Sequence, residues 1–423
     1  MARLDGDSRL AIEAIRNDTA GAPPGDARRA VAAANGAHVL HDGLSDLLYV
    51  YFPVWQAALG LDYAAVGLLK ACYSGAMAAP QLMAARLAER VGHPAVLAGG
   101  TALAALGYLA AAHAGGFAWL VAALLTAGVG ASAQHPLASD IVARMTPPLR
   151  RRRALGLYNT AGDVGKVLVP ALATGGLLVL SAPAVLQGIA AATLAAAAAI
   201  LAMLPRVPRP PPGPTEDGKA GDVSVWRQPG FRPLLAVGFI DSAARGGFLT
   251  FFPLALAAKG AAIGTIGLAL TLVFVGGAVG KFVCGPMGAR FGVLLTVAVT
   301  EGATAAGALA APFAPLWLAL MLAPLIGVAL NGTSTVLYGT VPELVPEAAR
   351  ARAFGVFYTG TISAGAVTPI VLGLVSDLVS LEAAMAGLAA FVLIAPVLTL
   401  CLRAPLAALA SSTGRPGHAG VAS

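Results

Sequence analysis

Twelve long apolar runs follow one another along this chain of 423 residues, separated by short polar or Pro- and Gly-containing breaks. A helix needs about 20 apolar residues to cross the hydrocarbon core of a bilayer. With 58% hydrophobic and only 11% charged residues, the chain has too little polar surface to fold as a water-soluble globule. We therefore predict an all-α membrane protein whose twelve transmembrane helices span residues 31–58, 64–88, 94–113, 117–144, 153–180, 184–204, 232–258, 263–289, 292–312, 315–341, 352–378 and 382–402.

The runs form two sets of six, with the Pro-rich segment PRVPRPPPGPTEDGKAGD (205–222) between them. The first 30 residues carry scattered charges and no apolar core, so we expect no cleaved signal peptide. The predicted organisation is an N-terminal tail (1–30), a six-helix bundle (31–204), a linker (205–231), a second six-helix bundle (232–404) and a C-terminal tail (405–423).

Basic residues gather in alternate loops. One set of loops holds Arg86 and Arg90, the run Arg150 to Arg153, and the basic residues of the central linker. The loops on the opposite side carry almost no positive charge beyond Lys259. This bias predicts that both termini and the linker are cytoplasmic. The net charge of +7 then reports membrane orientation and gives no reason to expect a nucleic-acid partner.

The two halves are internal repeats. YFPVWQAALGLDYAAVGLL from Tyr51 matches FFPLALAAKGAAIGTIGLA from Phe251 at a shift of 200 residues without a gap, and Pro170 matches Pro369 at a shift of 199. Because each copy contains six spans, both have the same orientation in the membrane, and they are related by an axis along the membrane normal. Transporters are built on this plan.

The sequence resembles the major facilitator superfamily. ARLAERVGH, from Ala85 to His93, is similar to the loop signature G-x-L-A-D-R-x-G-R of that family, as is GPMGARFG from Gly285. Within the superfamily the chain looks like the fosmidomycin-resistance type of efflux protein, through HVLHD from His38 and GVGASAQHP from Gly128. The resemblance implies a major facilitator fold with two six-helix bundles and export of a small compound.

A third similar element is AGDVG, from Ala161 to Gly165, which matches a glycine-rich stretch of the fifth span in this type of protein. Asp163 stands where the family has Asn, and Lys166 is a further departure. Both add charge to a helix that the resemblance places at the central cavity.

A polar stripe runs along the first span. His38, Asp42, Asp46, Tyr49 and Pro53 share one helical face. An isolated charge at the bilayer centre costs about 2.5 to 3.5 kcal/mol, so the stripe should face a water-filled cavity or a partner. Two carboxylates one turn apart repel each other when both are ionised, which favours binding of a proton.

Asp42 and Asp46 are therefore candidates for proton coupling, and His38 and His41 could modulate it. Because Asp42 matches the family element and Asp46 does not, we expect replacement of Asp42 by Asn to cause the larger loss of coupling. The alternative is that the two aspartates only hold helices together. Their partners would then be Lys70, Lys166 or His135.

In the second half, Asp241, Arg245, Phe248 and Phe252 share a face of the seventh span. The planar fork of Arg245 suits a carboxylate or phosphonate, although Asp241 and Arg245 could instead neutralise each other as a local pair. His135 could likewise contact substrate or bond a carbonyl freed by Pro136. The candidate substrate-binding residues are Tyr49, His135, Asp163, Lys166, Asp241, Arg245, Phe248 and Lys281.

Two further groups are candidates for gating. The residues that match the family loop signature should latch one conformation, and glycines and prolines within the fifth and eleventh spans should provide bends. The first group is Arg86, Glu89, Arg90, Gly92 and Arg290, and the second is Gly156, Gly162, Gly165, Pro170 and Pro369. Glu301, in a span expected to be peripheral, has no assigned role.

No catalytic motif accompanies these features: H-E-x-x-H, a Walker-type loop and a nucleophile elbow are absent from the sequence. Cys72, Cys284 and Cys401 fall in apolar runs without metal-ligand spacing. We expect no enzyme activity, no cofactor and no metal site.

The leading hypothesis is a proton-coupled antiporter, monomeric in the inner membrane among its lipids, that exports a small polar or anionic compound. The alternatives are a proton-coupled symporter that imports a small organic anion and a transport-inactive membrane receptor.

Overall fold

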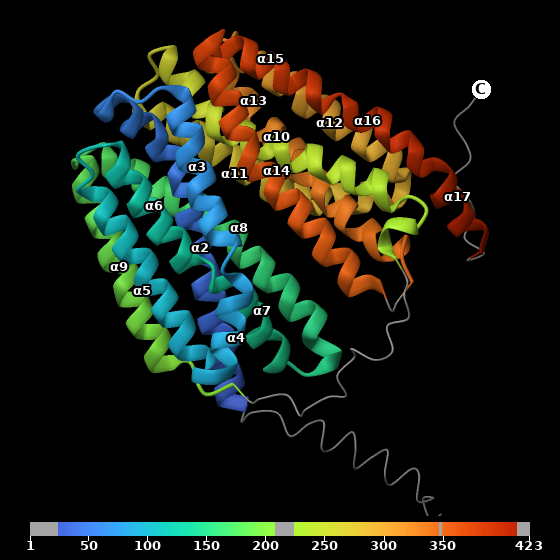
Figure 1. Cartoon of the computed structure of the whole chain (residues 1–423), viewed down its shortest axis with the longest axis horizontal. Helices are drawn as coiled ribbons and strands as arrows, with labels where there is room; N and C mark the ends of the chain where they lie inside the picture. Colours follow the sequence, from blue (N-terminus) through green and yellow to red (C-terminus); the bar gives the residue numbers. More distant parts are fainter. Residues whose placement is uncertain (1–23, 208–223, 347–348, 413–423) are drawn as a thin grey trace, which may run out of the picture.

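The computed structural model describes residues 24–207, 224–346 and 349–412, and almost all of these residues lie in helices (Figure 1). The first half contains α2 (Pro24–Leu59), α3 (Tyr63–Ala78), α4 (Gln81–Val91), α5 (His93–Ala112), α6 (Phe117–Ala131), α7 (Gln134–Arg144), α8 (Pro148–Leu177) and α9 (Ala182–Met203). The second half contains η2 (Val225–Arg227), α10 (Phe231–Ala258), α11 (Ile263–Phe291), α12 (Val293–Ala310), α13 (Leu316–Thr340), η3 (Val341–Glu343), α14 (Arg350–Leu378), α15 (Leu381–Val392), α16 (Ile394–Thr399), η5 (Leu400–Leu402) and α17 (Arg403–Ser412).

Each predicted span corresponds to one helix or to consecutive helices. The second span is divided into α3 and α4, the fourth into α6 and α7, and the last into α15, α16 and η5. Among the described residues, nine helices are long and apolar enough to cross a membrane. The other three spans miss this criterion because α2 and α8 carry charged side chains and α3 has only 16 residues. The prediction of an all-α membrane protein is confirmed.

The ends of the chain differ from the prediction. α2 begins at Pro24, inside the predicted tail 1–30, and α17 covers part of the predicted tail 405–423. Proline at the start of a helix loses no hydrogen bond, and the helix dipole favours the negative charge of Asp26 in the first turn. The helix therefore extends beyond its apolar run. The rest of the two tails and most of the linker, 208–223, lie outside the described residues.

Glycines end several of the helices. Gly92 and Gly292, which end α4 and α11, have φ angles of +97° and +85°, a conformation that side chains strongly disfavour. Gly60 directly follows α2, and Gly260 follows Lys259, the cap residue of α10; their φ angles are +62° and +76°. The Asp62 carboxylate then starts α3 by accepting a hydrogen bond of 2.7 Å from the backbone N–H of Ala65.

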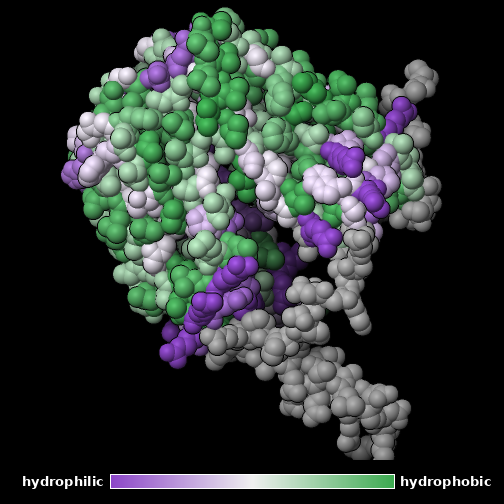
Figure 2. All heavy atoms as spheres, viewed as in Figure 1, coloured by the Kyte–Doolittle hydropathy of each residue, from purple (hydrophilic) through white to green (hydrophobic). Residues whose placement is uncertain are grey.

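The helices form two bundles, one for each half, which touch at one end and diverge at the other (Figure 1). α2 packs on α8 in the first half and α10 packs on α14 in the second. The main contacts between the halves join α3 to α14, α8 to α11 and α2 to α10. Figure 2 shows a hollow between the bundles with hydrophilic residues inside it, whereas most of the surrounding surface is apolar.

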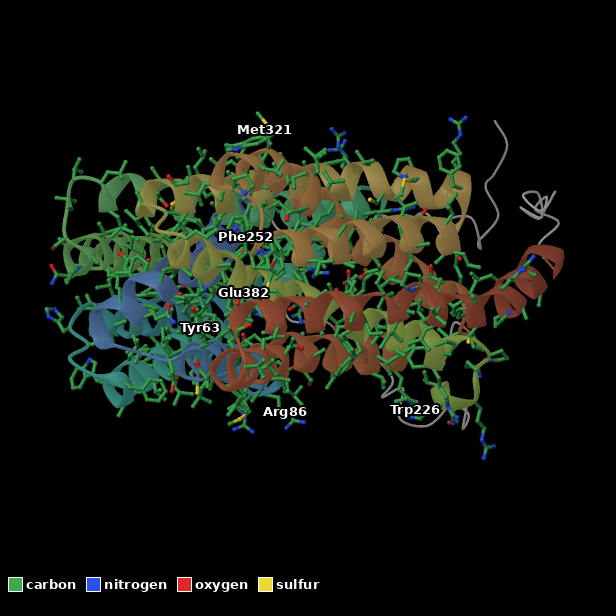
Figure 3. The ribbon with its side chains drawn as sticks, turned by 90° about the horizontal axis from the view of Figure 1, so that it is seen from above. Tyr63, Arg86, Trp226, Phe252, Met321 and Glu382 are labelled. Atoms are coloured by element: carbon green, nitrogen blue, oxygen red, sulfur yellow. The ribbon has the colours of Figure 1, made fainter. Side chains whose placement is uncertain are left out.

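The closed end is held by polar and close-packed contacts between α3 and α14. The Asp377 carboxylate accepts hydrogen bonds from the backbone N–H groups of Tyr63 (2.9 Å) and Ala64 (2.7 Å). Gly67 has no side chain and lies against the backbone carbonyl of Pro369. Figure 3 shows Tyr63, the first residue of α3, near Glu382 at the start of α15. α3 and α14 therefore form one seal between the halves.

The repeat-related contact joins α8 to α11 with different chemistry. Residue 178 corresponds to 377 at the shift of 199, and here Leu178 lies against Gly264. Gly267, the counterpart of Gly67, lies against the Thr174 side chain. At the position that Asp377 occupies in the first seal, the second seal thus has an apolar leucine.

Candidate functional site

The central cavity lies between the halves, and residues of both halves form its wall. It has an empty volume of about 410 Å³, and five helices contribute to its wall. Ionisable and aromatic side chains predominate, which suits a small polar compound. The lining residues are Asp46, Tyr49, Asp163, Lys166, Arg245, Leu249, Phe274, Gly277, Ala278 and Asn331.

Asp42, one turn before Asp46, is the centre of a buried charged cluster. Its Oδ2 lies 3.3 Å from His38 Nε2 and 3.4 Å from Lys166 Nζ, and its Oδ1 lies 3.5 Å from His135 Nε2. The three partners come from α2, α8 and α7 respectively. The pairing of Asp42 with Lys166 and His135, expected as the alternative to proton coupling, is present.

His38 is fixed by groups outside this cluster. Its Nδ1–H donates to the backbone carbonyl of Tyr158 at 2.7 Å, and its ring stacks on the Tyr158 ring with centroids 3.9 Å apart. A carbonyl only accepts, so neutral His38 has its proton on Nδ1 and its lone pair on Nε2. That lone pair faces the Asp42 carboxylate. Two acceptors therefore meet unless a proton or a cation lies between them.

Asp163 joins the two halves beside the cavity. Its Oδ1 accepts a hydrogen bond of 2.6 Å from Lys281 Nζ of α11 and lies 4.0 Å from Lys166 Nζ. The side chains of both lysines are 33% exposed, so water reaches them. Both departures from the family pattern, Asp163 and Lys166, thus belong to one charged network.

Asp46 has a different environment from Asp42. It lines the cavity, and no ion pair or hydrogen bond of its side chain is found within the described residues. Lys166 and Lys70 act on it electrostatically. Lys70 lies over the Tyr49 ring, 4.6 Å from its centroid. Asp46 is thus a cavity carboxyl without a fixed partner in the described part of the chain.

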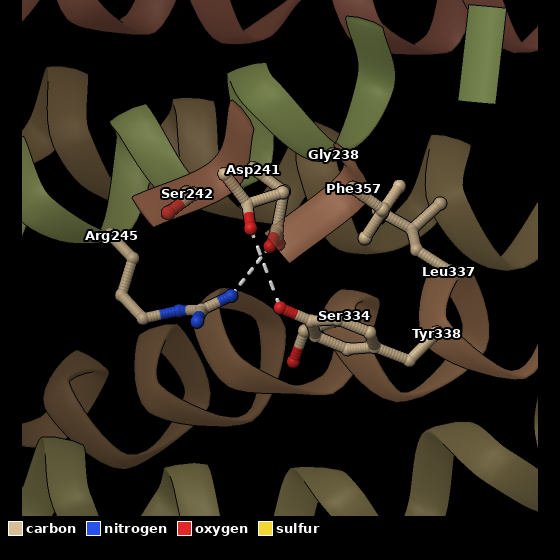
Figure 4. Close-up of a pocket in the computed structure, with 9 residues that line it drawn as sticks. Gly238, Asp241, Ser242, Arg245, Ser334, Leu337, Tyr338 and Phe357 are labelled. Atoms are coloured by element: carbon tan, nitrogen blue, oxygen red, sulfur yellow. Dashed lines mark hydrogen bonds and ion pairs between the residues drawn. The ribbon is translucent and has the colours of Figure 1, made fainter. Parts of the chain in front are cut away.

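A smaller cavity of about 200 Å³ lies within the second half (Figure 4). Asp241 Oδ2 and Arg245 Nη2 form an ion pair of 2.5 Å, and Arg245 Nε donates to the Leu330 carbonyl at 3.3 Å. Ser334 and Tyr338 face this pair across the cavity. The local pairing of Asp241 with Arg245 is therefore present, yet Arg245 also lines the central cavity.

Glu301 of α12, which the sequence left without a role, belongs to this group. Its side chain is buried, with 1% exposure, and it interacts with Asp241, Arg245 and Thr333. Its Oε2 has no hydrogen-bond partner within the described residues. Glu301 is therefore a third ionisable group of this site, beside Asp241 and Arg245. A carboxyl in the middle of an apolar run was the only sequence signal for it.

The family model of the Major Facilitator Superfamily (MFS) matches residues 36–257 and 234–422, which together include almost every described helix. The chain belongs to the Major Facilitator Superfamily. The resemblance drawn from the loop signature is confirmed by this match.

Curated relatives of this MFS chain are distant. It is 31% identical over 134 residues to an uncharacterized MFS-type transporter of Mycobacterium tuberculosis, a match that covers 32% of this chain and 23% of that protein. It is 27% identical over 137 residues to the fosmidomycin resistance protein of Escherichia coli, covering 32% and 34%. Both matches span well under half of those relatives. An uncharacterized MFS-type transporter of Bacillus subtilis is 24% identical over 361 residues, covering 83% and 87%.

Solved MFS structures share the fold. A bacterial homolog of the human lysosomal transporter Spinster, in an inward-facing and occupied conformation, superposes with a TM-score of 0.78 at 16% identity, covering 90% of this chain and 98% of that one. A nucleoside transporter gives a TM-score of 0.74 at 13% identity, covering 88% and 100%. At these identities the likeness supports the architecture alone.

Two predicted site residues of the MFS chain lie away from the cavity. Phe248 is fully buried and stacks on Phe252 with centroids 4.9 Å apart, so it packs the core instead of facing substrate. His41 Nε2–H donates to the Thr101 hydroxyl at 2.9 Å, because that hydroxyl donates to the Leu97 carbonyl. His41 therefore faces α5. The helical faces used to predict these two residues were therefore wider than the part of each helix that lines the cavity.

The loop-signature residues of the MFS chain lie at the open end. Arg86, Glu89 and Arg90 are exposed, and no ion pair within the described ranges includes them. Arg290 lies 5.4 Å from the ring centroid of Phe291. A latch between these residues stays a prediction for a conformation closed at this end.

The glycines and prolines predicted to bend the helices have unequal surroundings. Gly165 lies against the Val39 carbonyl and Gly162 against Asp42 and His38, whereas the Gly156 position faces open space. Pro170 and Pro369 are inside α8 and α14. Of the three glycines predicted to bend the fifth span, Gly162 and Gly165 are required as glycine by a close contact in this conformation.

Three side chains of types that can ligate a metal come together in the described part of the structure. One ligand atom from each of His38, Asp42 and His135 lies within 4.8 Å of the others. The third member comes from α7, about 90 residues along the chain, so no local spacing announces the group.

Proposed function

We propose that this protein is a proton-coupled antiporter that exports a small polar or anionic organic compound by alternating access. The observation that supports it most directly is the wall of the central cavity, where Asp46, Lys166 and Arg245 from both halves surround one space. Movement of the halves about such a site exposes it to one side of the membrane at a time.

The surroundings of Asp46 support its role as the proton carrier. Asp42 is held by His38, His135 and Lys166, whereas Asp46 lines the cavity and no fixed partner accompanies it in the described structure. A substrate hydroxyl or N–H group that bonds the Asp46 carboxylate competes with a proton for the same oxygen atoms. Mutually exclusive binding of proton and substrate is what antiport requires.

The cationic groups support recognition of an acidic substrate group. Arg245 offers a planar fork and Lys166 a point charge. Leu249 and Phe274 provide an apolar wall, and Asn331 provides an amide. A compound with one acidic group, hydrogen-bond donors and a short carbon frame fits these features.

The charge pattern supports export from the cytoplasm. The exposed run Arg150 to Arg153 begins α8 and Arg352 lies in the first turn of α14, both at the open end. The positive-inside bias makes this end cytoplasmic, and the conformation is then inward-open in the inner membrane. The name of the fosmidomycin resistance protein, a partial relative, also favours efflux.

One contact favours the second candidate function, symport of a proton with an organic anion. Lys166 Nζ lies 3.4 Å from Asp42 Oδ2. Protonation of Asp42 would release Lys166 to bind an anion, so that proton and anion would travel together. The sign of the coupling distinguishes the two functions.

Substrate flux in proteoliposomes with an imposed pH gradient tests the proposal. The wild-type chain should move substrate opposite to the proton flow, and Asp46→Asn should bind and exchange substrate without gradient-driven accumulation, because an amide does not exchange a proton. The family element predicted the larger loss at Asp42, but the partners of Asp42 lead us to expect the larger loss at Asp46.

Asp62→Asn is the matched control, since this residue caps α3 outside the cavity and Asn caps as well as Asp. Substrate movement along the proton flow would instead identify the symporter. Full gradient-driven transport by an Asp42→Asn/Asp46→Asn double variant would exclude both carboxyls as the proton site.

A further inference from the structure

We propose that His38, Asp42 and His135 form a binding site for a divalent transition-metal ion of the zinc class. The three ligand atoms lie within 4.8 Å of one another on α2 and α7. Imidazole and carboxylate together suit Zn²⁺, Co²⁺ and Ni²⁺ better than Mg²⁺ or Ca²⁺, which prefer oxygen atoms alone.

The two imidazoles lie near different oxygens of the Asp42 carboxylate, each farther away than in most hydrogen bonds, and the three ligand atoms come within 4.8 Å of one another, so the side chains must move closer together to share one ion. In a tetrahedral zinc site with bonds of about 2.0–2.1 Å, neighbouring ligand atoms are about 3.3–3.4 Å apart. The His38 Nε2 to Asp42 Oδ2 distance is 3.3 Å and the His135 Nε2 to Asp42 Oδ1 distance is 3.5 Å. Hydrogen bonds from a ring N–H to oxygen are most often about 2.9–3.0 Å long.

The orientation of His38 is that of a metal ligand. Metal-ligating histidines almost always donate their other ring N–H to a carboxylate, a carbonyl or water. His38 Nδ1–H donates to the Tyr158 carbonyl at 2.7 Å, and the ring is 5% exposed. The Nε2 lone pair is therefore fixed toward Asp42, where an ion would lie, before any ion binds.

Space and access are also present. A Cβ atom on Gly162 would lie 2.6 Å from Asp42 Oδ2 and 2.7 Å from His38 Nε2, so glycine keeps this side of the cluster open. The His135 side chain is 42% exposed, so protein does not close the cluster on that side. Three protein ligands leave one coordination position for water.

Lys166 is the group that an ion must displace. Its ammonium lies 3.4 Å from Asp42 Oδ2, and a cation on Asp42 would repel it. The side chain is 33% exposed and Asp163 Oδ1 is already 4.0 Å away, so Lys166 has a second carboxylate to pair with. The metal therefore competes with both Lys166 and a proton for Asp42.

Cobalt absorption of the full-length chain in detergent, after removal of any affinity tag, tests the site without measuring transport. Wild-type protein should bind one Co²⁺ with the intense visible bands of a tetrahedral complex, and Zn²⁺ should abolish them. His135→Ala, at an exposed position, should weaken binding by about tenfold or more. Gly162→Ala should do the same while all three ligands remain. His113→Ala, on the exposed histidine that follows α5, should bind like wild type.

Unchanged affinity in a His38→Gln/His135→Ala double variant would overturn the proposal, as would the absence of Co²⁺ binding by folded wild-type protein up to about 1 mM. Helix content and a single elution peak establish that each variant is folded. Because the readout is metal binding, failure here leaves the flux experiment on Asp46 unaffected.

Discussion

Arg245 lines both the central cavity and the smaller cavity of the second half. Its pairing with Asp241 holds the guanidinium in place but leaves N–H groups that face the central cavity. A carboxylate or phosphonate bound there would contact a fork that is already oriented. The residue thus joins the buried charges of the second half to the space where substrate is expected.

We predict that Arg245→Lys weakens substrate binding by about tenfold, the loss of roughly one charge-assisted hydrogen bond, since charge is kept and two-point geometry is lost. Binding to purified protein measures the effect. Arg403→Lys, at an exposed position of α17, is the matched control. Equal affinity in the Arg245 variant would leave this residue as a partner of Asp241 only.

The local pairs of the site were predictable from the sequence, and the long-range ones were not. His38 with Asp42 and Asp241 with Arg245 are four residues apart on one helix, so helical geometry alone brings them together. Lys281 reaches Asp163 across 118 residues. That contact depends on how two bundles meet, which no spacing encodes. Phe248 shows the converse error, since sharing a helical face did not place it in the cavity.

At the scale of elements, the seal between α3 and α14 is set by one side chain. Asp377 accepts two backbone N–H groups at the N-terminus of α3, where the helix dipole also favours a negative charge. Opening of this end must break both hydrogen bonds. The carboxylate therefore stabilises the conformation described here.

We predict that Asp377→Ala shifts the protein several-fold toward a conformation open at this end. Spin labels on Ala58 and Glu382, in a chain whose cysteines are replaced by Ala, report the separation of the halves as a distance distribution. Asp62→Ala is the control, because it removes a cap of the same helix that does not cross between the halves. An identical shift in both variants would mean that weakening the start of α3 is enough to open this end, without loss of the contact to Asp377.

At the scale of the whole molecule, the fold was the most predictable feature. Apolar runs of bilayer length and a repeat at a shift of 200 residues leave few arrangements besides two parallel six-helix bundles. A kink in the fourth span was expected at Pro136, and α7 begins two residues before this proline. The breaks in the second and last spans were not predicted, because the apolar runs continue through them. The open conformation was also not predicted, because the same sequence adopts every conformation of the transport cycle and its patterns do not distinguish one from another.

Membrane orientation gives the whole-molecule prediction. Reporters fused near Gly218 should indicate the cytoplasm, and reporters near Gly115 or Gly260, in turns at the other end, should indicate the outside. Activity of a pair of reporters, one active only inside and one only outside, measures this. The reverse pattern would overturn the charge argument and make the open end face outward.

The unlike seals of the closed end make the carrier respond differently to two kinds of environmental change. Salt screens the carboxylate seal of Asp377 on α3, while it leaves the contact of Leu178 with Gly264 unweakened. Cooling weakens apolar contacts, and therefore acts chiefly on the leucine side. Two repeats with one plan thus differ at their outermost contacts, where ionic strength acts on the Asp377 contact and temperature on the Leu178 contact.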